Sequence, residues 1–368
     1  MLDFHSYVLS HVEQSTTTFT VSYLVTLFSI LVTSEVGIIA LWAKNSRRRN
    51  AFELLSTVDK KILGIAPGSH LRDLKSPKAI FVITSVVMFT AAVAKNLTFC
   101  GTLEQHLYAV GSYAKNVAIL VLTGNYLNMV MLIQHRLRIL DDELRKHTYL
   151  RRSFVLTTTN EGLLSTSSTR AIGCASLWCP RNRRSSLIDL FGPRVDLELD
   201  GFVTLVAAVR SAYNSLCNIT SLVNDVYGTP IFFYLLTFCA VTTSNLLHIL
   251  LFWFRPAYIG NSSISYATLF TFLLWTVFHI LQTLTVIFAC SATNRWRQTL
   301  SDTVIELLVE PGMSDDASKE LTLFSDVIRM RRLEFSAGGF FTIDMPELFS
   351  MFSATVTYLI VLIQFSSP

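Results

Sequence analysis

The 368-residue chain is 51% hydrophobic and 15% charged, and its net charge is +4. Soluble domains carry about 25% charged residues, so this chain has too little charged surface to cover a soluble protein of its size. The mild positive charge gives no case for a nucleic-acid partner. The composition therefore indicates a protein embedded in a membrane.

Six apolar segments are long enough to cross a bilayer, which takes about 18 or more apolar residues in a helix. They are Phe19–Ala43, Ala79–Ala94 with its tail Asn96–Cys100, Leu107–Ile133, Pro230–Phe254, Ala267–Cys290 and Leu348–Phe365. These runs are too continuous for barrel strands, which alternate in polarity over about ten residues. We therefore expect an all-α polytopic bundle of six spanning helices.

Basic residues flank alternate ends of these segments, and such residues mark the cytoplasmic side of a membrane. The basic groups are Lys44–Arg49, Arg72–Lys78, Arg136–Lys146, Arg151–Arg184, Arg295–Arg297 and Arg329–Arg332. An even number of spans then places both ends of this chain outside. The sequons at Asn96 and Asn261 fall in predicted outer loops and are candidate glycosylation sites, whereas the sequon at Asn218 falls inside.

The sequence also predicts helical extensions on the cytoplasmic side. Residues 134–150 continue the third span as a charged helix, and residues 151–195 are Ser/Thr/Arg-rich and predict a flexible loop. Apolar positions return at helical spacing over Leu197–Asn224, and Gly228 and Pro230 mark the beginning of the fourth span. Such amphipathic helices need a partner for their apolar faces, so we expect them to pack together beneath the membrane.

Two further cytoplasmic helices are predicted, at residues 291–309 and 314–334, separated by Pro311-Gly312 and capped at Ser314 or Asp315. The chain therefore divides into an outer segment, three spans, a cytoplasmic region, two spans, a second cytoplasmic region and a last span. The corresponding boundaries are 1–18, 19–133, 134–229, 230–290, 291–346 and 347–368.

The last span carries a polar stripe near its outer end. Val361, Gln364 and Phe365 share one helical face, and Thr357 lies one turn below Val361. A small hydroxyl, an aliphatic constriction and an amide on one face suit the wall of a narrow, wettable pore. The alternative is a helix-packing stripe in which Gln364 bonds to a neighbouring helix.

Residues 357–365 read Thr-Tyr, five apolar residues, then Gln-Phe, and the run Glu334–Asp344 precedes them. In both features the chain resembles the insect gustatory receptors. The resemblance implies a tetrameric channel in the plasma membrane, with a central pore lined by the last span and cytoplasmic helices joining subunits. It implies gate positions at Val361 and Phe365 beside Gln364. That family has seven spans, and the one not counted here would be the first.

The resemblance also implies a ligand pocket open to the outside, among the outer halves of the spans. Polar side chains within spans usually face the bundle interior, and together with aromatic rings they suit a small amphipathic ligand. The candidate residues are Thr271, Trp275 and His279 in the fifth span, Asn245 and His248 in the fourth, and Tyr113 and Asn116 in the third. The alternative for each is an ordinary hydrogen bond between helices.

These features together predict a gustatory receptor that acts as a tastant-gated, weakly selective cation channel. Phe272 stands where sugar-binding members often have an amide, which favours a bitter or other non-sugar tastant. A G-protein-coupled receptor or a transporter is the alternative. No enzyme motif, metal cluster or cofactor signature occurs, so we expect no enzyme. The resemblance implies a small tastant, membrane lipid and other receptor subunits as partners. Glu35, inside the first span, needs an ionic partner such as Lys115, a proton or water.

Overall fold

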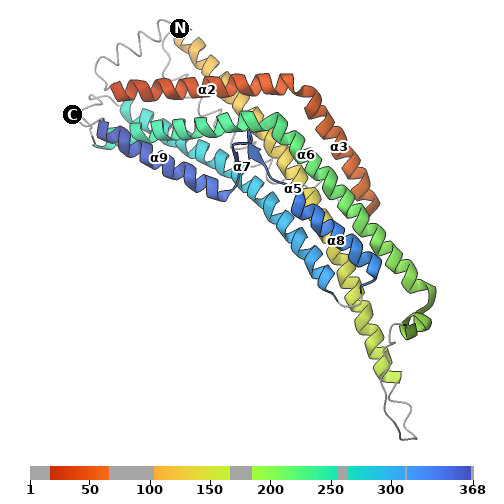
Figure 1. Cartoon of the computed structure of the whole chain (residues 1–368). Helices are drawn as coiled ribbons and strands as arrows, with labels where there is room; N and C mark the ends of the chain where they lie inside the picture. The colour runs from red at the N-terminus through yellow and green to blue at the C-terminus, as the bar shows by residue number, and fades with distance from the viewer. Residues whose placement is uncertain (1–16, 66–102, 166–184, 255–263, 311–312, 366–368) are drawn as a thin grey trace, which may run out of the picture.

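The computed structural model describes residues 17–65, 103–165, 185–254, 264–310 and 313–365, and nearly all of them are helical. The long helices lie side by side in an elongated bundle, with α9 and α2 on opposite sides of α6 at one end (Figure 1). The elements are α2 (Thr17–Ala43), α3 (Asn45–Ile65), α5 (Leu103–Ser165), α6 (Ser185–Phe254), α7 (Ile264–Val309), α8 (Asp315–Met330), β1 (Ser336–Ala337), β2 (Phe341–Thr342) and α9 (Met345–Phe365).

Five described helices are long and apolar enough to cross a membrane. They are α2, α5, α6, α7 and α9, and they contain the first, third, fourth, fifth and sixth predicted spans. The second predicted span, Ala79–Ala94, lies outside the described residues. The prediction of an all-α bundle with helical extensions beyond the spans is confirmed.

Three of these helices run without interruption far beyond the length of a span. Helices α5, α6 and α7 contain 63, 70 and 46 residues. The charged continuation of the third span over residues 134–150 is therefore confirmed, and the fifth span continues directly into the helix predicted at residues 291–309. At 1.5 Å per residue, α6 is about 105 Å long.

The flexible loop predicted over residues 151–195 is wrong at both ends. Residues 151–165 complete α5 and residues 185–195 begin α6, whereas residues 166–184 lie outside the described part. Extending an existing helix avoids the unfavourable nucleation step, so a polar composition that would not start a helix still continues one. Helix α6 likewise passes through Gly228 and Pro230 without a break, and it changes direction near the middle of its length (Figure 1).

Helix α3 was not predicted from the sequence, although it carries a clear apolar stripe. Ala51, Leu55, Val58 and Ile62 are buried, and the helix packs mainly against α6. A bidentate ion pair ties it to α5, because the Arg136 guanidinium donates to both carboxylate oxygens of Asp59 at 2.9 Å.

The helix predicted at residues 314–334 is α8, which ends at Met330. Its predicted N-cap is confirmed, since the Ser314 hydroxyl accepts a hydrogen bond from the Ala317 amide at 3.2 Å. Leu321, Phe324 and Ile328 bury its apolar face, and α8 contacts α6 and α7. These contacts show that the helices predicted beyond the spans pack together within one chain.

A short antiparallel hairpin, β1–β2, connects α8 to the last span. Gly338 and Gly339 form its turn with φ of 62° and 80°, the left-handed values that type I′ hairpin turns require at both central positions. The Phe340 amide closes this turn on the Ala337 carbonyl at 3.1 Å. The hairpin therefore gives the chain a compact, defined path into α9.

Candidate pore helix and interhelical ligand site

Helix α9 has two unlike faces. Leu348, Met351 and Thr355 are buried, at intervals that place them on one side of the helix. This side packs mainly on α6, where the Phe352 ring meets the edge of Phe238 at 6.2 Å between centroids. The packed side fixes which way the opposite side points.

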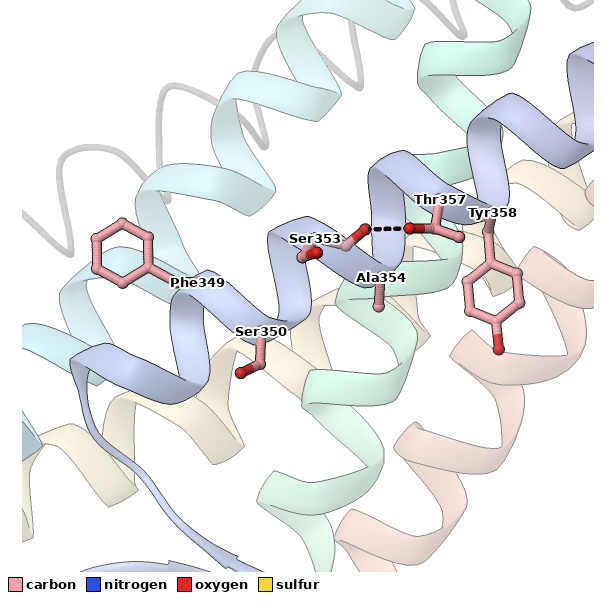
Figure 2. Close-up of a pocket in the computed structure, with 6 residues that line it drawn as sticks. All are labelled: Phe349, Ser350, Ser353, Ala354, Thr357 and Tyr358. Carbon is pink, nitrogen blue, oxygen red and sulfur yellow. Dashed lines mark hydrogen bonds between the residues drawn. The ribbon is translucent and has the colours of Figure 1, made fainter.

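The opposite face of α9 is exposed and carries small polar groups. A hollow of about 680 Å³ lies along it. Its lining residues, drawn as sticks in Figure 2, are Phe349, Ser350, Ser353, Ala354, Thr357 and Tyr358. Ser350 lies seven residues before Thr357, so the stripe begins two turns before the first residue predicted for it. The Thr357 hydroxyl donates to the Ser353 carbonyl at 2.9 Å (Figure 2). We call Ser350, Ser353, Thr357, Val361 and Gln364 the polar stripe.

The predicted gate residues continue this stripe towards the C-terminal end of α9. Val361 and Gln364 are both exposed, so Gln364 is not buried in a packing interface with another described helix. Phe365 is the last residue of α9, and its side chain lies outside the described residues. No acidic side chain interrupts the stripe between Ser350 and Gln364.

The hairpin at the base of α9 is fixed to α6. The Asn224 side chain bonds twice to the backbone leading into and through β1, donating to the Glu334 carbonyl at 2.9 Å and accepting from the Ser336 amide at 3.1 Å. One turn later, a Cβ on Gly228 would lie 3.0 Å from the Gly338 nitrogen and 3.2 Å from the Ser336 oxygen. The glycine thus allows α6 and the hairpin to approach backbone to backbone.

Further bonds hold the segment before the hairpin. Tyr213 and Cys217 on α6 both donate to the Arg331 carbonyl, at 2.9 and 3.5 Å. Burial raises the pKa of the Cys217 thiol, which keeps it protonated as a donor. Phe335 is buried with its ring edge-on to Tyr126 of α5 at 6.0 Å. The chain therefore reaches α9 locked to two other helices.

Several predicted ligand-site residues come together between α6 and α7. Asn245, His248 and His279 are all buried, and Trp275 is half-buried and stacked on His279 at 5.7 Å. His248 lies against Phe272 at 4.7 Å between ring centroids. Two buried nitrogens there, Asn245 Nδ2 and His279 Nδ1, have no hydrogen-bond partner among the described residues. Both nitrogens are therefore available for hydrogen bonds to a ligand between α6 and α7.

Other polar groups in the same interior are already paired, as the alternative interpretation expected. Gln282 donates to the Thr123 hydroxyl of α5 at 2.8 Å, and the Tyr234 and Thr283 hydroxyls lie 2.9 Å apart. These bonds hold α5, α6 and α7 together about one helical turn after His279. They form a layer of paired polar side chains that borders the candidate ligand site.

The remaining predicted residues are less informative. Asn116 is half-buried on α5, and the side chains of Tyr113 and Thr271 lie outside the described residues, as do Asn96 and Asn261. Glu35 is exposed on α2 and makes no ion pair with Lys115 or any other described residue. A metal site is absent from the described residues, because none of them form a cluster of three or more ligating side chains.

Comparison with known proteins adds two kinds of likeness. Gustatory receptor 68a of Drosophila melanogaster is 32% identical over 148 residues, which is 40% of this chain and 37% of that protein. Putative gustatory receptor 2a of the same fly is 50% identical over 46 residues, or 12% of this chain and 11% of that protein. Each of these matches spans well under half the length of the relative.

The likeness in structure is more extensive. The olfactory receptor OR5 of the insect Machilis hrabei superposes with a TM-score of 0.60 at 11% identity, covering 98% of this chain and 85% of that one. Its complex with eugenol superposes with a TM-score of 0.61 at 12% identity, covering 95% and 83%. At such low identity these matches show a shared fold.

The model of the 7tm chemosensory receptor family matches residues 2–367, nearly the whole chain. This match agrees with the gustatory-receptor resemblance of residues 357–365 and with the shared helical fold. The match to a receptor family agrees with the prediction that the chain is a receptor and not an enzyme. The chain belongs to the 7tm chemosensory receptor family.

Proposed function

We propose that this receptor is a ligand-gated, non-selective cation channel of the plasma membrane, assembled from four subunits and opened by a small non-sugar tastant. The observation that carries the proposal is the polar stripe of α9. Its hydroxyl and amide groups are exposed along a span whose other face is packed on α6. Polar groups on an apolar span are costly in lipid and are stabilised where they face water.

A shared axis between subunits supplies that water. When α9 of each subunit turns the polar stripe inward, Ser350, Ser353 and Thr357 line the inner part of the path with hydroxyls. Val361 narrows it further out and Gln364 sits beside this constriction. Because the stripe carries no carboxylate between Ser350 and Gln364, cations meet only dipoles there, which gives weak selectivity.

The ligand would occupy the interior between α6 and α7, with the unpaired nitrogens of Asn245 and His279 as bonding groups and Trp275 as an aromatic wall. The eugenol complex of the structurally similar olfactory receptor supports a small organic ligand. Helix α6 carries both Asn245 and the Asn224–Gly228 seat of the hairpin. A shift of α6 on ligand binding would therefore reach the base of α9 and open the Val361 constriction.

Cysteine accessibility along α9 tests the pore. Ser353→Cys, Thr357→Cys and Val361→Cys are each expressed as the full chain, and ligand-evoked current is recorded before and after a charged methanethiosulfonate reagent. We expect current to fall in all three variants. Val356→Cys is the matched control, because Val356 is exposed on α9 but lies off the polar stripe, and its current should persist. Equal sensitivity at Val356 and Thr357, or insensitivity at all positions, would contradict the pore assignment.

A further inference from the structure

The exposed side of α2 and α3 carries apolar and aromatic side chains first, followed along the chain by polar and basic ones. Backbone bonds from Lys44 to Ala40 and from Arg48 to Lys44 connect the two helices across a break at Lys44. Both helices pack on α6, so the residues of each that point away from α6 lie on the outside of the bundle. The face consists of Ile38, Ile39, Trp42, Ser46 and Arg49, all exposed, and we call it the interfacial face.

Trp42 sets the depth of this face. Its side chain is 83% exposed at the end of a span, and Ile38 and Ile39 beside it are 53% and 60% exposed. Tryptophan prefers the boundary between hydrocarbon and headgroups, because its ring is apolar and its N–H seeks a polar partner. The isoleucines then face acyl chains, and the residues after Trp42 face the headgroup layer.

The basic residues that follow Trp42 differ in whether they make hydrogen bonds or ion pairs within the chain. Lys44 donates to the Asp225 carbonyl, Arg47 pairs with the Asp225 carboxylate at 3.2 Å, and Arg48 donates to Asn45 at 2.8 Å. By contrast, Arg49 makes no hydrogen bond or ion pair with any residue that the structure describes. Its charge is therefore available to an outside partner.

The reach of Arg49 matches the thickness of a headgroup layer. Arg49 lies seven residues beyond Trp42, in the first two turns of the next helix, and seven residues of helix rise about 10 Å. Helical side chains lean back towards the N-terminus, which brings the guanidinium closer to Trp42. The guanidinium therefore reaches the layer of phosphates, which is about 5–7 Å thick on each side of the hydrocarbon core. Ser46 lies between the two residues on the same face and adds a hydroxyl donor.

We propose that the interfacial face binds an anionic phospholipid of the cytoplasmic leaflet. The acyl chains lie along Ile38 and Ile39, the Trp42 indole sits at the glycerol level, and Arg49 and Ser46 bond the phosphate and its anionic headgroup. This assignment rests on the orientation predicted from the basic residues, with Ala43 at the cytoplasmic side. Glu53, one turn beyond Arg49 on the same face, limits how far an anionic headgroup extends along α3.

Native mass spectrometry of the purified full chain in detergent tests this inference. Phosphatidylserine or phosphatidylcholine is added at equal concentrations, and the bound lipid is counted for each. We expect the wild type to prefer phosphatidylserine, Arg49→Gln to reduce that preference about fivefold, and Trp42→Ala to reduce binding of both lipids. Lys60→Gln is the matched control, because Lys60 is exposed on the same face of α3 but lies about 16 Å further from the membrane along the helix.

Two results would overturn the inference. One is an unchanged preference for phosphatidylserine in Arg49→Gln, and the other is a loss of that preference in Lys60→Gln as large as in Arg49→Gln. A Glu53→Gln variant should bind phosphatidylserine at least as well as the wild type, and weaker binding there would also count against it. The experiment measures bound lipid and not current, so its result does not depend on the channel proposal. Elution of Trp42→Ala at the wild-type volume in size-exclusion chromatography shows that this variant is folded.

Discussion

The close approach of α6 to the hairpin before α9 can be tested by replacing Gly228 with alanine. The added Cβ would lie 3.0 Å from the Gly338 nitrogen and 3.2 Å from the Ser336 oxygen. Both are backbone atoms, so no side-chain rotation relieves the contact. The hairpin can move away only by stretching the two bonds that Asn224 makes to the Glu334 carbonyl and the Ser336 amide.

Two opposing effects decide the size of the change. Overpacking of this kind costs about 1–3 kcal/mol, whereas alanine in place of glycine within a helix gains up to about 1 kcal/mol. The net expectation for Gly228→Ala is a loss of about 1–2 kcal/mol. Gly201→Ala, on the same helix, meets no atom within 4 Å, so it should show only the gain.

Thermal stability of the detergent-solubilised receptor, followed by size-exclusion chromatography after heating, measures both variants side by side. We expect the midpoint of Gly228→Ala to fall by several degrees while that of Gly201→Ala stays level or rises. If Gly228→Ala proved as stable as Gly201→Ala, the hairpin would not be seated against α6 as described, and the coupling from α6 to α9 would lose its basis.

Two further predictions concern the interior. Asp59→Ala leaves the Arg136 guanidinium, which is 4% exposed, without its carboxylate partner and should destabilise the chain by about 3 kcal/mol. In the same heating assay, adding Arg136→Met should restore part of the lost stability. A double variant no more stable than Asp59→Ala would contradict the ion pair. Trp275→Ala should raise the ligand concentration needed for half-maximal current at unchanged surface expression, whereas Val277→Ala, 52% exposed on the same helix, should not. Identical dose–response curves for both would remove Trp275 from the ligand site.

The membrane class and the spanning helices could be predicted from the sequence because hydrocarbon thickness fixes the length of an apolar run. The two helices between the fifth and sixth predicted spans could also be predicted, since Pro311-Gly312 lies between them and Ser314 provides a capping hydroxyl. The C-terminal end of α5 could not be predicted in this way. Residues 151–165 lack an apolar period, and only their attachment to an existing helix makes them helical.

Other features were present in the sequence but not recognised. The spacing of Ala51, Leu55, Val58 and Ile62 is that of an amphipathic helix, and it was obscured by the basic run before it. The Gly338-Gly339 pair is likewise a typical hairpin turn. The seat of that hairpin on Asn224 and Gly228 could not have been predicted, because nothing local to either residue indicates a partner more than one hundred positions away.

The continuity of α6 has a consequence for the length of the chain. Asn224, which holds the hairpin, and Tyr234, which bonds Thr283 inside the membrane, stand ten residues apart on one helix with no loop between them. Inserting or deleting a single residue in that interval would rotate one contact by about 100° relative to the other. A loop would absorb such a change, whereas here it would disengage one half of the receptor from the other, so homologous chains should tolerate substitutions in this interval far more readily than changes in its length.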